Sequence, residues 1–464
     1  MKKLYFIVGS QDLYGEEVLK QVAAHGKEMA QYLDEKVRGV EIVWKATVRS
    51  SEEAEDVLVE ASASKECIGV IVWMHTFSPA KMWIKGLQRL TKPLLHLHTQ
   101  YNRELPYKTI DMDFMNLNQA AHGDREFGFI CTRLGLCREV VAGYYKNVNV
   151  IARINRFADV ARAMDYSHNL RVAMFGNNMR DVAVTDGDRV ESEIRFGWNV
   201  NYYGVGDLTQ IAALVTEAEI DQKMSDYTTR YEMNTENIAA VREQAKFAVA
   251  LDKFLEKERI GAFTDTFQDL HGMKQLPGLL VQDVMANGVG FGPEGDYKTS
   301  ALMAVLCKMA EGREGATAFL EDYTYDLTEG EELELASHML EVSPVFAANK
   351  PKIEVHPLGI GGKEPPARLV FDGIEGKGIA VSMVDMGTHF RLICAAIELV
   401  RQPEEMPMLP VARVMWKILP DFASGAESWI YAGGAHHAVV STALTKEDIA
   451  LFAKLTNTEV VFIG

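Results

Sequence analysis

The first third of the chain alternates short apolar runs with helical patterns, and this alternation constrains the fold more than any other feature of the sequence. Four short apolar runs have the length and residue types of strands: 4–8, 41–44, 68–74 and 93–98. Between them, residues 16–33 and 52–63 repeat their apolar side chains at helical spacing. Strands that alternate with helices form a parallel sheet covered on both faces. We therefore expect an α/β domain of Rossmann or flavodoxin type over residues 1–170.

The loops that follow the strands of this domain are candidate binding segments. Ligands of parallel α/β folds bind beyond the carboxyl ends of the strands. Gly9-Ser-Gln-Asp-Leu-Tyr-Gly15 follows the first predicted strand, and Met74-His-Thr-Phe-Ser-Pro79 follows the third. Both segments carry polar side chains, and we expect them at the ligand-binding edge of the sheet.

The same pattern begins again in the middle of the chain. Strands are expected at residues 171–175, 200–205 and 262–266, and a long helical stretch covers roughly residues 231–257. A further apolar helical stretch follows at residues 299–309. This organisation predicts a second α/β domain, over residues 171–316.

The last third of the chain has a different pattern, in which β-like runs follow one another without long helices between them. The runs lie at residues 353–357, 368–371, 379–384, 391–399 and 429–432, and a final one ends at residue 464. Glycine-containing turns separate several of them. Closely spaced strands predict an antiparallel sheet or barrel. We therefore expect a β-rich, barrel-like C-terminal domain over residues 317–464.

Composition narrows the classes of partner. A chain of 464 residues is too long for one hydrophobic core, and two or three domains are expected. The formal net charge is −17 at pH 7, and such a surface repels the phosphates of nucleic acids and of anionic lipids. A small molecule is therefore a better ligand than a nucleic acid or a membrane.

The N-terminus and the cysteines indicate a cytoplasmic protein. The apolar run after Met1-Lys-Lys stops at Gly9, which is too short for a secretion signal, and a buried first strand explains it better. The five cysteines are odd in number and contain no Cys-x-x-Cys pair. Reduced, buried thiols are the favoured interpretation.

Two glutamates and two histidines in the second half carry the chemistry that can be recognised by residue type. They are Glu294 in Phe-Gly-Pro-Glu-Gly-Asp, Glu321 in Phe-Leu-Glu-Asp-Tyr, His338 in Ala-Ser-His-Met-Leu and His437 in Gly-Gly-Ala-His-His. Two carboxylates and two imidazoles can hold a divalent cation and leave positions for a substrate. Each residue also has a structural interpretation: an exposed turn for Glu294, a solvated strand face for Glu321 and a hydrogen-bonded core for His338.

Neighbouring motifs leave further alternatives open. His436 and His437 are adjacent, and on a strand their side chains point to opposite faces, so only one of them reaches a given metal. His96 and His98 have strand-face spacing and form either a small metal site or a buried strand end. The glycines before Glu294 do not make a phosphate loop, because Tyr297 rather than glycine precedes Lys298.

Several longer motifs, in the right order along essentially the whole chain, resemble those of the bacterial L-arabinose isomerase family. They are Gly9-Ser-Gln-Asp-Leu-Tyr-Gly15, Trp73-Met-His-Thr-Phe-Ser-Pro-Ala-Lys-Met-Trp-Ile84, Asp111-Met-Asp-Phe-Met-Asn-Leu-Asn-Gln119, Phe175-Gly-Asn-Asn-Met-Arg180, Val184-Thr-Asp-Gly-Asp188, Asp269-Leu-His-Gly272, Gln275-Leu-Pro-Gly278, Glu321-Asp-Tyr-Thr-Tyr325 and Ala432-Gly-Gly-Ala-His-His437. Many ordered matches are more specific than any single motif.

The resemblance implies a set of site residues and a cofactor. The family's metal ligands fall on Glu294, Glu321, His338 and His437, with one Mn²⁺ per subunit as the usual ion and Co²⁺ or Mg²⁺ as substitutes. The substrate-binding positions fall on Gln11, Leu13, Phe77, His122, Met179, Phe267 and Tyr323. The resemblance also implies a cytoplasmic homohexamer whose active sites are shared between subunits. Similar isomerases continue for a short stretch beyond Gly464, but all four ligands are present here, so we expect the chemistry to be retained.

These expectations predict one type of reaction, an aldose–ketose isomerisation. It would interconvert L-arabinose and L-ribulose and, in addition, D-galactose and D-tagatose. A metal with about six ligands would polarise O1 and O2 of the open-chain sugar. Glu294 and Glu321 would act as the acid–base pair of an enediol route, with a hydride shift as the rival route. A sugar-binding protein without turnover, a metal-dependent hydrolase and a related L-fucose-type isomerase are the alternatives.

Overall fold

A five-stranded parallel sheet organises the N-terminal part of the computed structural model, which describes residues 1–359 and 361–464. The strand order is β2-β1-β3-β4-β5, and all neighbours run parallel. Their bounds are β1 Lys3–Gly9, β2 Glu41–Val48, β3 Cys67–Met74, β4 Leu94–His98 and β5 Glu139–Ala142. This order places a topological switch point between β1 and β3, where a crevice forms beyond the carboxyl ends of the two strands.

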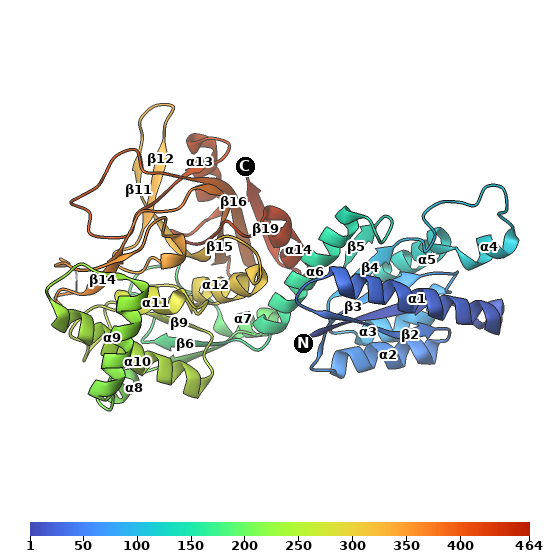
Figure 1. Cartoon of the computed structure of the whole chain (residues 1–464), viewed down its shortest axis with the longest axis horizontal. Helices are drawn as coiled ribbons and strands as arrows, with labels where there is room; N and C mark the ends of the chain where they lie inside the picture. Colours follow the sequence, from blue (N-terminus) through green and yellow to red (C-terminus); the bar gives the residue numbers. More distant parts are fainter. Residues whose placement is uncertain (360) are drawn as a thin grey trace. The chain divides into compact units, whose positions relative to one another are not determined.

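Helices cover both faces of this sheet (Figure 1). Their bounds are α1 Glu16–Lys36, α2 Ser51–Ala63, α3 Ile84–Arg89, α4 Met112–Leu117, α5 Ala120–Arg133 and α6 Val148–Ser167, with short 3-10 turns at η1 Asp12–Tyr14 and η2 Ala80–Trp83. One buried cluster packs α2, α3 and α5 against Tyr5 and Ile7 of β1. On the other face α1 approaches Val8, and Phe157 of α6 lies beside Leu4. Because both faces are covered, residues 4–8 of β1 are all buried and apolar or aromatic instead of alternating with polar residues.

The predicted parallel α/β fold is therefore confirmed, and so are the four strands read from the sequence. The fifth strand, β5, was not predicted. It is only four residues long, and its side chains alternate between buried and exposed positions. A short alternating run of this kind does not stand out from a loop in the sequence.

Contacts along the chain divide it into two compact units. The N-terminal unit comprises Met1–Asp165 with Lys454–Asn457, and the C-terminal unit comprises Tyr166–Ala453 with Thr458–Gly464. The domain boundaries expected at residues 170 and 316 stay predictions. Among the described residues, no helix is both long enough and apolar enough to cross a membrane.

The C-terminal unit contains a second parallel sheet, of order β10-β9-β6-β7. Its strands are β6 Arg171–Phe175, β7 Asn199–Tyr203, β9 Ala262–Asp265 and β10 Gly290–Phe291. The helices of this region are α7 Arg189–Phe196, α8 Val205–Ala212, α9 Glu217–Arg230, α10 Ile238–Glu258, α11 Leu279–Met285 and α12 Tyr297–Ala310. The second α/β pattern read from the sequence is thus confirmed.

The long helix expected from residue 231 begins later than predicted. Residues 232–233 form the short strand β8 Glu232–Met233, and α10 starts at Ile238, where the Asn237 side chain accepts a hydrogen bond from the Ala240 amide. β8 pairs with β13 Lys352–Val355, which in turn pairs with β14 Ala367–Val370. A pairing with residues more than a hundred positions away therefore overrides the local helical pattern.

Six antiparallel strands of the C-terminal unit close into a barrel, as predicted (Figure 1). They are β11 Thr317–Asp326, β12 Leu333–Ser337, β15 Gly376–Asp385, β16 Phe390–Val400, β17 Val414–Ile418 and β18 His437–Ser441. The order is β15-β18-β11-β12-β17-β16, and the pairing of β15 with β16 closes the ring. The last strand, β19 Glu459–Ile463, adds to β16 in parallel. The remaining elements are η3 Pro344–Phe346, α13 Phe422–Ala432 and α14 Lys446–Thr456.

The prediction of a strand at residues 429–432 is wrong, because this segment is the last turn of α13. The Asp421 side chain accepts a hydrogen bond from the Ser424 amide at the start of the helix, and Gly433 ends it with a φ of 81°. Trp-Ile-Tyr-Ala is a short apolar run that periodicity alone cannot assign. The two caps decide the conformation.

Candidate metal centre

Strands β11, β12 and β18 bring three of the four predicted metal ligands together. Glu321 lies on β11 and faces His437, the first residue of β18, across an antiparallel pair. On its other side Glu321 faces the last residue of β12, and His338 follows directly. The Nε2 atom of His338 lies 3.6 Å from Oε2 of Glu321. Sheet register therefore unites residues that are far apart in the sequence.

Both imidazoles pack against one aromatic ring. Phe319 lies two residues before Glu321 on β11, so its side chain points to the same face of the strand. Its ring centroid lies 5.6 Å from that of His338 and 5.4 Å from that of His437, and both contacts are edge-to-face. Such contacts restrict the rotation of both histidine rings.

Glu294 reaches the cluster from the turn between β10 and α12. Its φ of 62° is left-handed, a conformation that glutamate rarely adopts. The Met179 amide donates a hydrogen bond of 2.9 Å to the Glu294 carbonyl and holds the turn. The Oε2 atom of Glu294 lies 3.9 Å from Nε2 of His437. Backbone conformations of this kind persist where the surrounding structure imposes them, and they cluster at functional sites.

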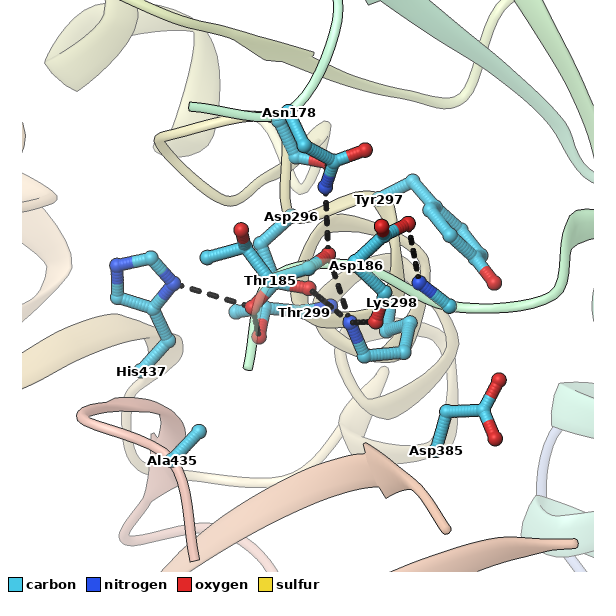
Figure 2. Close-up of polar contacts among 12 residues, drawn as sticks. Asn178, Thr185, Asp186, Asp296, Tyr297, Lys298, Thr299, Asp385, Ala435 and His437 are labelled. Carbon is cyan, nitrogen blue, oxygen red and sulfur yellow. Dashed lines mark hydrogen bonds and ion pairs between the residues drawn. The ribbon is translucent and has the colours of Figure 1, made fainter. Parts of the chain in front are cut away.

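A buried carboxylate orients His437. The Nδ1 atom of His437 lies 3.0 Å from Oδ2 of Asp296, which is the N-cap residue of α12 (Figure 2). Burial opposes ionisation of Asp296, but Lys298 and the bond to His437 outweigh it and hold the pKa of Asp296 below its usual value. An ionised Asp296 accepts the proton of Nδ1. The Nε2 atom of His437 then keeps its lone pair, and it is buried without a hydrogen-bond partner.

A second buried carboxylate orients His338. Glu341 is fully buried and contacts Nδ1 of His338, which leaves Nε2 directed toward Glu321. Burial lowers the pKa of His338, but the carboxylate of Glu341, with Glu321 and Glu294 beyond it, raises the pKa to about 9. In the absence of a cation this imidazole is therefore protonated at neutral pH. A bound cation would displace that proton from Nε2.

These donors fit a divalent metal ion. Each histidine donates through Nδ1 to a carboxylate and presents Nε2 to the cluster, which is the arrangement that metal-binding histidines use. The unpartnered Nε2 of His437 is the kind of buried polar atom that needs a ligand. Glu294 thus lies near His437, and Glu321 lies near His338 and opposite His437, whereas the grouping of all four as metal ligands, which the family resemblance implies, stays a prediction.

His436 also lies at this cluster. Its Nε2 atom is 3.3 Å from Oε2 of Glu294, and the donor atoms of Glu294, His436 and His437 all lie within 4.8 Å of one another. The hydrogen bond to Glu294 raises the pKa of His436, and the same bond lowers the pKa of Glu294. The geometry therefore places both histidines of the pair within reach of Glu294, whereas the sequence favoured His437 alone.

Sequence reasoning missed two contributors, Asp296 and Glu341, and it favoured His437 over His436. Both missed residues had a signal in their spacing. Asp296 stands two residues after Glu294 in the same turn, and Glu341 stands three residues after His338. A carboxylate this close in sequence to a candidate metal ligand is a candidate for the residue that orients it.

Three of the predicted substrate-binding residues lie around the cluster in the C-terminal unit. Phe267 follows β9, and its ring stacks on His338 with 6.1 Å between centroids. Met179 is joined to the Glu294 turn through its backbone. Tyr323 is 52% exposed, and together with His338 it lines a hollow at the surface. Aromatic and apolar side chains beside a polar cluster suit a small hydroxylated ligand.

The other four predicted substrate-binding residues belong to the N-terminal unit. Gln11 and Leu13 follow β1, and Phe77 follows β3, so all three lie at the switch point of the sheet. Phe77 packs on His122 of α5 with 4.4 Å between ring centroids. Leu13 is 82% exposed. The first and third strands thus bring Gln11, Leu13 and Phe77 to the edge where α/β sheets bind ligands.

His96 and His98 share one carboxylate, that of Asp124. Nε2 of His96 lies 2.8 Å from one oxygen of Asp124, and Nδ1 of His98 lies 2.7 Å from the other. His96 is buried in the middle of β4, and His98 is the half-buried last residue of that strand. The structural interpretation, a buried strand end, therefore accounts for this pair.

The family follows from comparison with known sequences. Residues 1–169, 171–312 and 316–459 match the L-arabinose isomerase N-terminal, central and C-terminal domains, respectively. The chain belongs to the L-arabinose isomerase family. It is thus an enzyme of the isomerase class, and the resemblance of its motifs to this family is confirmed.

Several L-arabinose isomerases match the whole chain. The L-arabinose isomerases of Anoxybacillus flavithermus and Geobacillus stearothermophilus are each 51% identical over 469 aligned positions and cover 100% of this chain, with 93% and 94% of their own lengths. The Clostridium beijerinckii L-arabinose isomerase is 51% identical over 463 positions, covering 100% of this chain and 94% of its own. A periplasmic solute-binding protein of Actinobacillus succinogenes 130z, solved with D-allose, covers 67% of this chain and 92% of its own at 11% identity, but its TM-score of 0.17 supports no conclusion about fold or ligand.

Proposed function

We propose that this isomerase converts L-arabinose to L-ribulose, and D-galactose to D-tagatose, by metal-assisted proton transfer. The observations that support the proposal are the pairs Glu321–His338 and Glu294–His437, with side-chain atoms 3.6 and 3.9 Å apart, and the orientation of both imidazoles by buried carboxylates. Membership of the L-arabinose isomerase family supplies the substrate class.

The four residues would hold one Mn²⁺ per subunit, with Co²⁺ or Mg²⁺ as substitutes. Carboxylate oxygens together with imidazole nitrogens suit Mn²⁺. When bound, the cation supplies a positive charge that polarises the carbonyl and hydroxyl oxygens of the open-chain sugar. Asp296 and Glu341 hold the Nδ1 protons of the two histidines, so that the Nε2 atoms remain available.

Glu294 and Glu321 then move the protons. One carboxylate would take the proton from C2 of the aldose and deliver a proton to C1, and the other would transfer the hydroxyl proton from O2 to O1, which gives an enediol route. The Glu294 carboxylate is ionised at neutral pH, because the hydrogen bond from His436 lowers its pKa. Phe267 and Tyr323 lie beside the ligands and would exclude water from the reacting carbons.

The subunits would assemble into a cytoplasmic homohexamer in which the N-terminal unit of one copy completes the site of another. In this arrangement Gln11, Leu13, Phe77 and His122 contact the sugar bound at a neighbour's metal. Their location at the switch point of a parallel sheet supports a ligand-binding role. The high exposure of Leu13 also suits a residue that contacts a partner subunit.

A ketose assay tests the function directly. The EDTA-treated protein is assayed with L-arabinose and with D-galactose, before and after Mn²⁺ is added back, and ketose is expected only with metal. The two sugars differ by one CH₂OH group, so a preference of about 1–3 kcal/mol in transition-state binding is expected. Sugar binding that survives EDTA, without ketose under any metal, would instead identify a binding protein, and hydrolysis products would identify a hydrolase.

Isotope transfer distinguishes the two chemical routes. With deuterium at C2 of L-arabinose, an enediol route releases the label to solvent, because a carboxylate carries it. A hydride shift would retain the label in the product. Mass spectrometry of the ketose after partial conversion measures the retained fraction, and complete retention would exclude Glu294 and Glu321 as the C2 proton carriers.

Removal of either carboxylate should suppress turnover far more than sugar binding. Glu294→Gln and Glu321→Gln each remove a proton acceptor, and losses of about 10²–10⁴-fold in kcat are expected. Glu459→Gln is the matched control, since this carboxylate also bonds a histidine, His389, but has no contact with the cluster. Near-normal turnover of both site variants with metal present would refute the assignment.

A further inference from the structure

Lys298 is a buried cation next to the metal centre that the proposed reaction does not use. It is the second residue of α12, and its side chain is 0% exposed. Its Nζ atom donates hydrogen bonds of 2.8 and 2.7 Å to the backbone carbonyls of Thr185 and Asp186, and it lies 3.2 Å from Oδ1 of Asp296 (Figure 2). All three donor positions of the ammonium group are therefore engaged.

The position is unfavourable for a lysine unless these contacts compensate it. Transfer of an ammonium group from water into the protein interior carries a large desolvation penalty. The N-terminus of a helix also repels a positive charge, since the amide dipoles point the same way. An apolar residue of similar length would fill the same space without either penalty. The retained charge thus suggests a task beyond filling the core.

The two carbonyls that Lys298 bonds belong to the loop that follows β6, residues 176–188, which we call the pocket loop. The pocket loop includes Met179 of the predicted sugar pocket. Near its start, the Met179 amide bonds the Glu294 carbonyl, and Asn178 Nδ2 bonds the Gly295 carbonyl at 3.0 Å. Near the end of the pocket loop, the two hydrogen bonds from Lys298 to the carbonyls of residues 185 and 186 are the only ones that join the loop to α12 within the described part of the chain.

The same ammonium group also holds the carboxylate that orients His437. The Oδ1 atom of Asp296 forms an ion pair with Lys298, and its Oδ2 atom accepts a hydrogen bond from Nδ1 of His437. Lys298 thus stands between the pocket loop on one side and the Asp296–His437 pair on the other. A shift of either side changes the position of the other through a chain of only two contacts.

We propose that Lys298 is a positioning residue that ties the pocket loop to the Asp296–His437 pair and so couples sugar binding to the geometry of the metal centre. The coupling to the metal rests on the proposed function. The tie to the pocket loop does not depend on it, because the loop carbonyls and Lys298 are in contact without any ligand.

Lys298→Met is the variant that removes the tie and keeps the length of the side chain. Loss of a partner that orients a metal ligand commonly weakens metal affinity by about 10–100-fold, and we expect this range for the Kd of Mn²⁺ measured by calorimetry on EDTA-treated protein. We also expect a raised KM for L-arabinose, and faster amide hydrogen exchange over residues 176–188 in the metal-free protein.

Lys363→Met is the matched control. Lys363 likewise donates to two backbone carbonyls, those of Leu270 and Met273, both at 2.7 Å, but it contacts no carboxylate of the cluster. Its removal should lower thermal stability while the Mn²⁺ affinity and the exchange of the pocket loop stay at wild-type values. A Lys298→Met protein that folds and matches this control in Mn²⁺ affinity and loop exchange would overturn the proposal.

Gly187→Ala perturbs the contact between Lys298 and the pocket loop from the loop side. It is the second test variant if Lys298→Met does not fold. A Cβ atom at Gly187 would lie 2.9 Å from Oη of Tyr297 and 3.1 Å from Cδ of Lys298, so that the tyrosine must shift and the lysine side chain must move by a few tenths of an ångström. We expect a several-fold weaker Mn²⁺ affinity and faster exchange of the pocket loop, and wild-type values of both would refute the tie. If the wild-type protein itself bound no Mn²⁺, the proposed function would fail, whereas the exchange measurement would still decide whether Lys298 holds the loop.

Discussion

At the scale of single residues, the adjacent residues His436 and His437 have different environments, because His437 begins strand β18 and His436 lies in the bend before it. His437 is completely buried and bonded to Asp296, whereas His436 is only half-buried and bonds Glu294. The sequence predicted that only one of the two could reach a metal. The turn that carries Glu294 approaches both histidines, so the alternation of strand faces does not by itself decide which of them can reach a metal.

Glu334 gives a prediction for pH at this scale. It lies on β12 inside the barrel, bonded by Trp416 Nε1, and burial raises its pKa to about 7. A carboxyl whose pKa is higher in the folded state than in the unfolded state costs stability as the pH rises from about 4.5 to 7. Glu334→Gln removes this penalty and should raise the free energy of unfolding by on the order of 3 kcal/mol at pH 8.

The gain from Glu334→Gln should shrink at pH 5, where the folded protein already binds the proton. Denaturant unfolding at both pH values measures the difference. A control is Glu331→Gln, an exposed glutamate three residues earlier, which should leave stability unchanged at both pH values. An equal effect of Glu334→Gln at pH 5 and pH 8 would mean that Glu334 is ionised in the folded protein at both.

At the scale of elements, the turn between β10 and α12 is the part that most directly sets the metal centre. It holds Glu294 at a left-handed φ, and Gly295 follows with a φ of 79°. The main chain of Gly295 lies against the pocket loop, and a Cβ atom there would come within 2.4 Å of Asn178 Cα. Only glycine fits both the conformation and the contact.

Gly295→Ala should therefore displace Glu294 and reduce turnover by at least tenfold. Part of the effect of such a substitution is backbone strain, which Gly312→Ala reproduces: Gly312 has a φ of 81° but open space around it. Ketose formation and thermal unfolding of the two variants separate the clash from the strain. Equal activity of Gly295→Ala and Gly312→Ala would show that the close contact with residues 177 and 178 does not position Glu294.

At the scale of the whole molecule, the proposed metal joins two architectures within the C-terminal unit. Glu294 follows the parallel sheet, and the other three ligands belong to the barrel. A ligand that binds only the folded state stabilises it by RT ln(1 + [L]/Kd), which is about 2.7 kcal/mol at a concentration of 100 times Kd. Mn²⁺ should therefore stabilise the sheet and the barrel together.

Thermal unfolding with EDTA and with added Mn²⁺ tests this expectation. The wild-type protein should unfold at a higher temperature with Mn²⁺, and EDTA should reverse the shift. His437→Gln should lose the shift, because it removes the unpartnered Nε2 atom. A shift of the same size in His437→Gln and in wild type would place the binding site for Mn²⁺ elsewhere.

Much of the fold was predictable from the sequence, because its signals are local. Runs of apolar residues such as 68–74 mark buried parallel strands, and the alternation of these strands with helices leaves few topologies. Where local signals are short or ambiguous, as at β5, β8 and the end of α13, the prediction missed the element or assigned it wrongly. In those places hydrogen bonding to distant residues or a helix cap determines the conformation.

By itself the sequence determined the class of each domain, the family and the residue types of the site. Only the tertiary structure decided that Glu321 faces His437, that His338 follows the strand beside them, and which nitrogen of each imidazole is free. It also revealed Asp296, Glu341 and Lys298 behind the ligands. The physical reason is that the register of β11 with β18, the Asp296–His437 contact and the Lys298–Thr185 hydrogen bond join positions more than a hundred residues apart, and no local pattern encodes such pairings.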